Sequence, residues 1–404
     1  MSAIANRCVI TLNAGSSSIK FALFEEVSDA LKPHAVGLAE MAGEERRLTI
    51  RDGAGEIIHQ AKRQERSDVP FHAEALRRIL SWRQGAFPNA NVVAAGHRVV
   101  HGGVNHAAPA LVTDAVLKDL EALIPLAPLH QPYNIAGIVG AREAWPHVAQ
   151  VACFDTAFHR SHPYVNDTFA LPRELYDEGV RRYGFHGLSY EYVTRKLREI
   201  APLHAAGRVV VAHLGNGASM CAIRDGLSVA SSMGFTALDG LPMGTRCGQL
   251  DPGVVLYLMQ EKKMSADEIV DLLYKRSGLL GLSGFSNDMR ELLASERPEA
   301  QQAIEYFVFR IRRELGGLAA VLKGIDAIVF CGGIGENAWQ VRERALEGME
   351  WIGVELDRTS NRANEEIISS ERSRTRVFVV KTNEEAMIAK HTLALFDAQS
   401  RRAA

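Results

Sequence analysis

The sequence contains few cysteines and no long apolar run, and each absence excludes a class of protein. Five of the 404 residues are cysteine, and no two of them form a C-x-x-C pair. Such a scattered, odd set predicts buried thiols in a reducing compartment rather than a disulfide-built miniprotein. No run approaches the ~20 apolar residues that a spanning helix needs, and the apolar stretch 8–12 is too short for a signal peptide. We therefore expect a cytoplasmic protein without a membrane partner.

Net charge is also nearly absent. The chain carries 46 basic and 48 acidic side chains, a net charge of −2. This balance gives no general attraction to nucleic acid or anionic lipid, so we expect no nucleic-acid partner and only a local anion site. With 47% hydrophobic residues the chain is not disordered, and at roughly 150 residues per domain its length predicts two or three domains.

Short β-branched runs alternate with longer helical stretches, and this alternation predicts an α/β fold. Ser265-Ala-Asp-Glu268 and Thr382-Asn-Glu-Glu385 fit the capping-box pattern and predict two helix starts. The predicted strands are 8–12, 19–24, 148–154, 209–212, 220–224, 327–331 and 376–380, and the predicted helices are 71–82, 114–123, 189–200, 266–275, 298–323, 338–347 and 384–396.

The two halves of the chain share a pattern. Each half opens with a strand, a turn of small residues and a returning strand; the turns are Asn13-Ala-Gly-Ser-Ser-Ser18 and His213-Leu-Gly-Asn-Gly-Ala-Ser219. Each later has a buried strand that ends in a polar or glycine-rich turn, at Asp155 and at 332–337. This order predicts a duplicated α/β domain; a chance likeness of two hairpins is the alternative.

The turns of small residues suit phosphate binding, because glycine and serine let backbone N–H groups approach an anion closely. The sequence has no G-x-x-x-x-G-K-[ST], no G-x-G-x-x-G that opens a helix and no D-F-G motif of protein kinases. Any nucleotide would therefore be bound by the loops of another fold. The turn 332–337 is the stronger candidate because it precedes a helix, whereas 213–217 can also be a simple glycine hairpin.

Two arginines lie among apolar and glycine residues rather than on a charged surface. Arg98 is in Gly96-His-Arg-Val-Val-His-Gly-Gly103, and Arg246 is in Gly240-Leu-Pro-Met-Gly-Thr-Arg-Cys-Gly248. A guanidinium in such a segment needs an anionic partner, either a substrate carboxylate or phosphate or an internal acid in a structural ion pair.

Histidines and carboxylates give weaker signals. His97 and His101 are too far apart along a strand, at ~13 Å, to share a zinc ion. His130 and His186 lie in loops, where functional residues concentrate, although structural histidines are the alternative. Asp155 ends a buried strand, which is an unfavourable place for an unused charge. Spacing alone identifies no magnesium ligand.

The motifs taken together resemble the acetate kinase family. Val9-Ile-Thr-Leu-Asn-Ala-Gly-Ser-Ser-Ser-Ile-Lys20 is similar to its first signature, and Gly96–Gly103 is similar to its second. Collinear matches over nearly the whole chain follow at 154–159, 183–188, 213–219, 243–246, 286–290, 332–337 and 382–385.

The resemblance implies a duplicated, actin-like fold of the sugar kinase and heat-shock ATPase superfamily, with two ribonuclease-H-like domains around a cleft, in a homodimer. It implies a first domain of residues 1–157 with 389–404, a second domain of 158–388, and ATP, ADP, acetate and acetyl phosphate as ligands. The implied reaction is a reversible, Mg²⁺-dependent transfer of the γ-phosphoryl group of ATP to acetate by direct in-line attack, with Mn²⁺ as a substitute ion.

The resemblance also assigns roles by position. It implies a catalytic aspartate and two transition-state stabilisers, an acid pocket with the arginine that binds the substrate carboxylate, a set of ATP contacts, and two residues of the magnesium site. The implied catalytic aspartate is Asp155, and the implied transition-state stabilisers are His186 and Arg246. The implied acid pocket consists of Arg98, which binds the carboxylate, with Val100, Leu129, His130 and Phe185, and the implied magnesium-site residues are Asn13 and Glu384. The implied ATP contacts are Lys20, Ser16, Ser18, His213, Leu214, Gly215, Asn216, Gly217, Asp288, Met289, Arg290, Gly333, Ile334, Gly335, Glu336 and Asn337.

The sequence departs from the family pattern at Ala237, where many relatives carry proline. Loss of that ring can enlarge the acyl pocket, which makes a propionate or butyrate kinase the nearest alternative. A nucleotide-binding regulator without activity is a second alternative, but such a protein has no need to keep Arg98, Asp155, His186 and Arg246 together.

Overall fold

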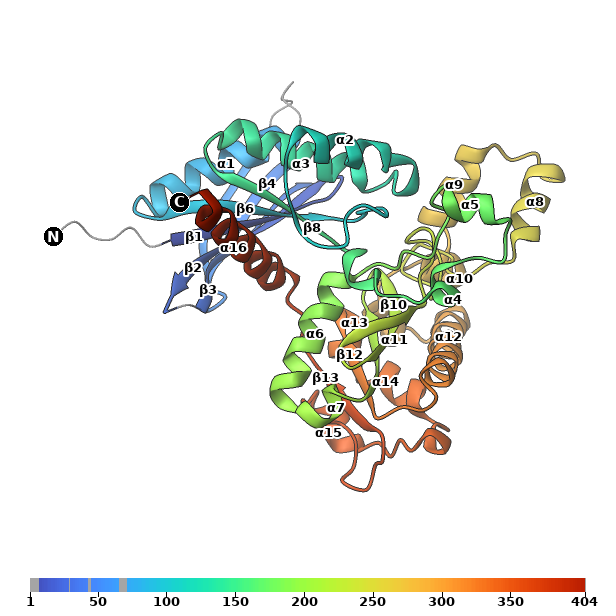
Figure 1. The fold of residues 1–404 in the computed structure, drawn as a ribbon. Helices are drawn as coiled ribbons and strands as arrows, with labels where there is room; N and C mark the ends of the chain where they lie inside the picture. The colour runs from blue at the N-terminus through green and yellow to red at the C-terminus, as the bar shows by residue number, and fades with distance from the viewer. Residues whose placement is uncertain (1–6, 29, 43–44, 65–70, 404) are drawn as a thin grey trace. The chain divides into compact units, whose positions relative to one another are not determined.

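The computed structural model describes residues 7–28, 30–42, 45–64 and 71–403, which fall into two compact units (Figure 1). The first unit is Met1–Ala157 with Asn383–Ala404, and the second is Phe158–Thr382. The chain returns to the first unit at residue 383 rather than at the expected 389, because helix α16 (Glu384–Ala403) packs along its length on the first sheet.

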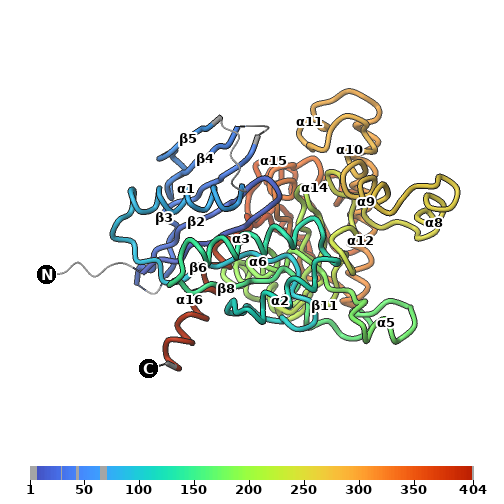
Figure 2. The backbone as a smooth tube through the Cα atoms, turned by 90° about the horizontal axis from the view of Figure 1, so that it is seen from above, coloured from blue at the N-terminus to red at the C-terminus, as the bar shows by residue number. Residues whose placement is uncertain are grey.

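The first unit is built on an eight-stranded sheet in the order β5-β4-β3-β2-β1-β6-β8-β7. Strands β1, β6 and β8 run parallel, whereas β2 and β3 continue the sheet antiparallel to their neighbours. In Figure 2 the outer strands β4 and β5 lie at the edge of the sheet away from α16. The strands are β1 (Arg7–Ala14), β2 (Ser18–Val27), β3 (Ala30–Ala42), β4 (Glu45–Asp52), β5 (Ile57–Gln64), β6 (Asn91–Val99), β7 (Ala110–Leu111) and β8 (Ala149–Phe154).

Helices cover both faces of this sheet, as the alternation of apolar side chains along β1 requires. Ile10 and Leu12 pack toward α1 (Phe71–Ala86) and α3 (Gln131–Ala144), while Val9 packs toward α16. Helix α2 (Asp114–Ala122) lies against α3. At Gly96 on β6 a Cβ atom would lie 2.1 Å from Thr392 Oγ1, so the close approach of α16 requires glycine there.

The second unit is built on a five-stranded sheet in the order β11-β10-β9-β12-β13. Its strands are β9 (Arg208–Leu214), β10 (Ala218–Arg224), β11 (Leu227–Ser231), β12 (Ala327–Cys331) and β13 (Arg376–Val379). Strands β9, β12 and β13 run parallel, and β10 and β11 continue antiparallel. The strands β3-β2-β1-β6-β8 have the same order and directions, which confirms the predicted duplication.

The second sheet is also covered on both faces. Helices α6 (Gly187–Ile200) and α7 (Pro202–Ala205) pack on one face through Val193, Leu197 and Ala205, and the long helix α12 (Pro298–Leu322) packs on β10 and β9. The remaining helices are α4 (Tyr164–Asp167), α5 (Arg173–Asp177), α8 (Pro252–Gln260), α9 (Ala266–Lys275), α10 (Gly278–Ser283), α11 (Met289–Ala294), α13 (Gly332–Asn337), α14 (Trp339–Leu346) and α15 (Arg358–Arg362).

The predicted helix starts have different outcomes. Ser265 and Glu268 form the expected capping box of α9. The expected box at Thr382–Glu385 is wrong, because the Asn383 side chain caps α16 by accepting from the backbone N–H of Ala386 at 2.9 Å. The hydroxyl of Thr382 is bound to Ser189 instead. Within the described ranges, no helix has the length and apolar character needed to cross a membrane.

Candidate active site

In the first unit, four of the predicted residues meet at the carboxyl ends of parallel strands, where α/β proteins usually bind ligands. Arg98 near the end of β6 donates to Asp155, which follows β8, through Nε at 3.1 Å and Nη2 at 2.6 Å. Arg98 Nε also lies 3.4 Å from Glu384 Oε2 at the start of α16, and Nη1 lies 3.5 Å from Asn13 Oδ1 on β1. The structure therefore contains the internal ion pair that the sequence left as an alternative.

The Arg98–Asp155 pair is buried, with 1% of the aspartate side chain and 20% of the arginine side chain exposed. Burial, opposed by the lowering effect of Arg98 and assisted by the nearby Glu384 carboxylate, raises the pKa of Asp155 to about 6. Burial opposes the charge of Arg98, but the attraction of Asp155 and Glu384 leaves its pKa raised. Arg98 is therefore charged, and both of its nitrogens that face Asp155 are occupied.

The oxygen atoms around Arg98 also fit a hard divalent cation. Asn13, Asp155 and Glu384 supply amide and carboxylate oxygens, the ligand type that Mg²⁺ prefers. In the described part of the chain, no group of three or more His, Cys, Asp or Glu side chains is arranged to hold a metal. A magnesium ion there would use one or two protein ligands and complete its shell with water and phosphate, which is its usual mode.

The β1–β2 hairpin carries Lys20, Ser16 and Ser18. Lys20 pairs with Asn13 across the two strands, and directly opposed residues project from the same face of a sheet. Lys20 and Ser16 are exposed, Ser18 is half-buried, and a hydrogen bond from Gly15 N to Ser18 O closes the turn at 2.8 Å. The lysine and the serines are therefore available for an anion on the side of the sheet that carries Asn13.

The predicted acid-pocket residues of this unit occupy two adjacent segments. Val100 is buried just after β6, and Leu129 and His130 are half-buried before α3. Sequence reasoning missed Asn134 on α3, whose amide donates to Ala14 O at 2.9 Å and accepts from Val100 N at 3.0 Å. Asn134 thereby fixes the ends of β1 and β6, and its local sequence gives no signal of this role.

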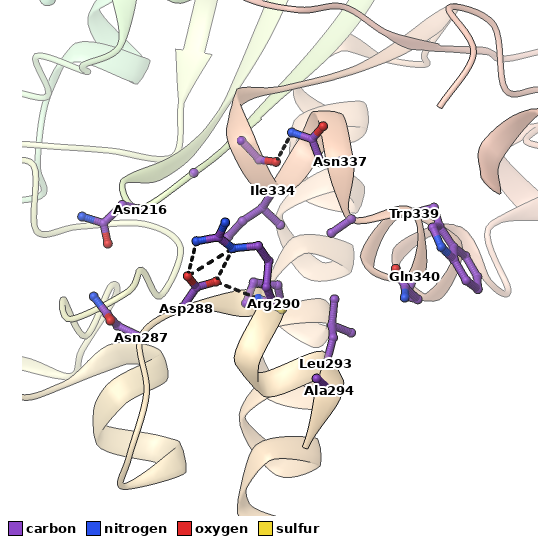
Figure 3. Close-up of a pocket in the computed structure, with 14 residues that line it drawn as sticks. Asn216, Asn287, Asp288, Arg290, Leu293, Ala294, Ile334, Asn337, Trp339 and Gln340 are labelled. Carbon is purple, nitrogen blue, oxygen red and sulfur yellow. Dashed lines mark hydrogen bonds and ion pairs between the residues drawn. The ribbon is translucent and has the colours of Figure 1, made fainter. Parts of the chain in front are cut away.

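In the second unit, three predicted nucleotide segments line one cavity of about 840 Å³ (Figure 3). They contribute Gly215 and Asn216, then 288–290, and then Gly333, Ile334 and Asn337. Arg290 lies against Asp288 and donates to it from Nε at 3.0 Å. Sequence reasoning missed the remaining lining residues, Asn287, Leu293, Ala294, Ala338, Trp339 and Gln340. His213, Leu214, Gly217, Gly335 and Glu336 do not line the cavity.

The segment 332–337, predicted as a turn, forms the short helix α13, and it is held by its own side chains and by a buried arginine. Glu336 Oε1 accepts from the backbone N–H groups of Gly332 at 2.9 Å and Thr382 at 3.1 Å, so this carboxylate stabilises the turn. Arg342, which is fully buried, donates to Gly335 O at 2.8 Å and to oxygens of Asn361. Burial lowers the pKa of Arg342 to about 10, so the guanidinium stays charged at neutral pH.

His186 and His213 stack on each other, with ring centroids 4.3 Å apart and an interplanar angle of 21°. His186 precedes α6 in a left-handed conformation, φ +58°, and follows the buried Phe185. Nδ1 of His186 lies 2.8 Å from Ser219 Oγ, and Nδ1 of His213 lies 2.8 Å from Ser189 Oγ. His213 thus packs against the ring of His186.

Arg246 lies in a half-buried loop whose backbone is fixed by several hydrogen bonds. Its Nη1 donates to Ala237 O at 3.0 Å and lies 3.5 Å from Met243 Sδ. At Gly278, with φ +61°, a Cβ atom would lie 2.1 Å from Met243 O, so only glycine allows this loop to pack there. Ala237, the position that departs from the family pattern, thus holds Arg246 through its backbone carbonyl.

The repeated strand order, with an arginine–carboxylate cluster on one sheet and a large cavity between glycine turns on the other, defines a duplicated α/β protein of the actin-like class. The model of the acetokinase family matches residues 8–390. The chain belongs to the acetokinase family.

Curated proteins and solved structures agree with this assignment. An acetate kinase of Methylocella silvestris is 80% identical over 97% of this chain and 98% of that protein, and one of Rhodopseudomonas palustris strain TIE-1 is 50% identical over 96% and 98%. The crystal structure of a propionate kinase from Francisella tularensis has a TM-score of 0.89 at 36% identity, over 96% of this chain and 99% of that one. That of Porphyromonas gingivalis acetate kinase has a TM-score of 0.86 at 37% identity, with the same coverage.

Proposed function

We propose that the chain catalyses the reversible transfer of the γ-phosphoryl group of ATP to acetate, which gives acetyl phosphate and ADP. The observation that carries this proposal is the geometry of Arg98. Asp155 fixes one edge of the guanidinium, whereas the partner of Nη1 among the described residues is Asn13 Oδ1 at 3.5 Å, which is too long for a strong hydrogen bond. A guanidinium held in this way presents Nη1 to a carboxylate or phosphate oxygen, and we propose the carboxylate of acetate as that partner.

The first unit would bind the acid. Nη1 of Arg98 donates to the carboxylate of acetate, and Val100 and Leu129 give the methyl group an apolar surface. Acetate, with a pKa near that of Glu at about 4.3, is already ionised at neutral pH, so its attack on phosphorus needs no general base. Asp155, with both oxygens on Arg98, positions the arginine rather than removing a proton.

The second unit would bind the nucleotide and stabilise the transferred group. The cavity of about 840 Å³ between 215–216, 288–290 and 333–337 has room for an adenosine moiety. His186 and Arg246 donate to the equatorial oxygens of the phosphoryl group, over which a loose transition state spreads its charge. These donors act mainly on kcat, since they bind the transition state more tightly than the ground state.

We place the magnesium ion at Asn13 and Glu384, with Asp155 near them. A Mg²⁺ ion held there would supply positive charge that stabilises the negative charge of the phosphate groups. Lys20, on the same face of the sheet as Asn13, adds a donor for phosphate, and Ser16 and Ser18 add hydroxyl and backbone donors. Mn²⁺, which takes the same oxygen ligands, would substitute.

The choice between acetate and propionate depends on a pocket that differs from the family pattern. Alanine at 237 gives the loop of Arg246 more freedom than proline would, and one methylene is worth only ~1–3 kcal/mol in such a pocket. We expect appreciable turnover of propionate. A kcat/KM for propionate below about a thousandth of that for acetate would contradict this expectation.

We also propose that the chain works as a homodimer in the cytoplasm. Helix α8 buries none of its side chains within the described structure, and Leu256, Tyr257 and Met259 are each about half exposed. Such an apolar face fits a second copy of the chain. Light scattering of the parent should give twice the chain mass, and Leu256→Glu should give the monomer mass.

The direct test measures acyl phosphate. The purified chain is incubated with ATP, Mg²⁺ and hydroxylamine in the presence of acetate, propionate or butyrate, and acyl hydroxamate is measured. We expect more acyl hydroxamate with acetate than with propionate or butyrate. We expect none without an added acid and none after chelation of the metal. Binding of ATP without any hydroxamate would favour the nucleotide-binding regulator and refute the proposed activity.

A further inference from the structure

The stacked rings of His186 and His213 have the same orientation with respect to the turn between β9 and β10. A Cβ atom at Gly217 would lie 3.1 Å from His186 Nε2, and one at Gly215 would lie 3.8 Å from His213 Nε2. Both Nε2 atoms therefore face the turn between β9 and β10, while both Nδ1 atoms are bound to serine hydroxyls. The protons on these rings decide whether the Nε2 edges offer donors or acceptors.

A buried tyrosine decides the direction of the hydrogen bonds at His186. The Tyr190 hydroxyl is within hydrogen-bond distance of Ser219 Oγ, and both side chains have no exposed surface. In the described part of the chain, Ser219 is the one hydrogen-bond partner of that hydroxyl. Burial raises the pKa of Tyr190 well above its ordinary value, so the phenol keeps its proton.

The hydrogen bonds that join Tyr190, Ser219 and His186 can satisfy every donor and acceptor in one arrangement. Tyr190 donates to Ser219 Oγ, and the hydroxyl proton of Ser219 is then directed to His186 Nδ1. The opposite direction would leave the phenolic proton of Tyr190 buried without an acceptor, which is unfavourable. Nδ1 of a neutral His186 is then an acceptor, so its ring proton is on Nε2.

We propose that Tyr190 and Ser219 are positioning residues that hold His186 as the neutral Nε2–H tautomer, so that its edge at the Gly217 turn is a hydrogen-bond donor. This inference rests on the proposed function, in which His186 donates to the oxygens of the transferred phosphoryl group. The Nδ1–H tautomer would direct a lone pair at those oxygens. The hydroxyl chain thereby gives a donor without requiring the imidazolium form.

His213 provides an internal comparison. Its Nδ1 lies 2.8 Å from Ser189 Oγ and 3.8 Å from Cys331 Sγ, and Ser189 Oγ lies 2.8 Å from Thr382 Oγ1, where either hydroxyl can be the donor. Among the contacts of the described residues, no phenol donates to Ser189, so the direction of these hydrogen bonds is not fixed in the same way. The tautomer of His213 should therefore respond to Ser189→Ala, while that of His186 should not.

The test reads the tautomer directly by long-range 1H–15N correlation spectra of the full-length chain. The chain has 14 histidines, and the His186→Gln variant assigns the His186 signals by their loss. We expect the neutral Nε2–H pattern for His186 in the parent and in Ser189→Ala. In Ser219→Ala and Tyr190→Phe we expect a mixture of tautomers or a mobile ring. A neutral Nδ1–H ring or an imidazolium in the parent at neutral pH would overturn the proposal.

Kinetics supply the second measurement. Ser219→Ala should lower kcat about tenfold while KM for ATP changes less than about threefold, and Ser219→Thr should restore most of kcat. Tyr190→Phe, which keeps the buried ring, should lower kcat in the same direction. Unchanged kcat in both folded variants would also overturn the proposal. The spectra need no turnover, so an inactive parent would refute the proposed function and leave the tautomer assignment readable.

Discussion

Replacement of Arg98 by methionine should impair acid binding and stability together, for separable reasons. The methionine side chain fills a similar volume but lacks the bidentate contact with Asp155 and the Nη1 donor that faces Asn13. A charge-assisted hydrogen bond to a carboxylate is worth about 1.5–3 kcal/mol, so kcat/KM for acetate should fall roughly 10- to 150-fold. KM for ATP should change little, because the proposed nucleotide cavity is made by other residues.

The stability cost follows from the burial of the partner. Loss of one member of a buried pair costs about 3–5 kcal/mol when the other stays charged. Asp155, whose pKa is already raised to about 6, can take up a proton instead of staying charged. We therefore expect Arg98→Met to lower the free energy of unfolding by about 3 kcal/mol at neutral pH. In the variant the folded-state pKa of Asp155 lies further above the unfolded value. The native state then holds that proton more tightly, and the destabilisation should be smaller at pH 5 than at pH 8.

A surface ion pair in the same unit supplies the matched control. Arg142 donates to Asp114 at 3.0 Å, and 92% of the Asp114 side chain is exposed. Arg142→Met should cost less than about 1 kcal/mol and leave KM for acetate unchanged. Urea unfolding and hydroxamate kinetics measure both variants. An unchanged KM for acetate in folded Arg98→Met, or an equal loss in Arg142→Met, would refute the reasoning.

Four further predictions follow from other parts of the structure. Arg246→Ala should lower kcat by about 10²–10³ while KM for ATP changes little, and near-normal turnover would remove Arg246 from the transition state. Ala237→Pro should lower the ratio of propionate to acetate turnover, and an unchanged ratio would show that this loop does not limit the pocket. Arg342→Met should lower the free energy of unfolding by about 3 kcal/mol, because oxygens now bound to the guanidinium, including Gly335 O, lose their donors; a stability equal to the parent's would contradict this. Burial lowers the pKa of His97 to about 4, so stability present above pH 6.5 should be lost as the pH falls toward 4; His97→Gln should flatten this dependence in urea titrations, and an unchanged slope would exclude His97 as its source.

The duplication could be predicted from the sequence because its signals are local. Each half contains a turn of small residues between two apolar runs, at 13–18 and 213–219, and these turns connect β1 to β2 and β9 to β10. Strand β4 and the edge strand β5 were missed because their sequences lack a clear apolar alternation. Arg46 and Arg47 interrupt β4, and Ile57 on β5 is 49% exposed. Edge strands that face solvent commonly carry such charges.

The site was predicted residue by residue from family motifs, but its internal contacts were not. No spacing rule connects Asn134 with the ends of β1 and β6, because that contact arises only when α3 packs on the sheet. The helix cap at Asn383 was misplaced by one residue, since both threonine and asparagine fit the cap position. The roles assigned to the site residues stay predictions, and the experiments above test them.

The contacts of Asp155 support a positioning role for this carboxylate over a role as general base. A general base needs an oxygen free to accept a proton and a substrate that carries one. Both oxygens of Asp155 accept from Arg98, and a pKa raised by burial to about 6 leaves the group mostly ionised at neutral pH. The substrate acetate is ionised at neutral pH and therefore has no proton for a base to remove. We therefore expect Asp155 to act through Arg98. Asp155→Asn should raise KM for acetate, and Asp155→Glu should raise it as well, since a longer side chain cannot keep the same bidentate geometry.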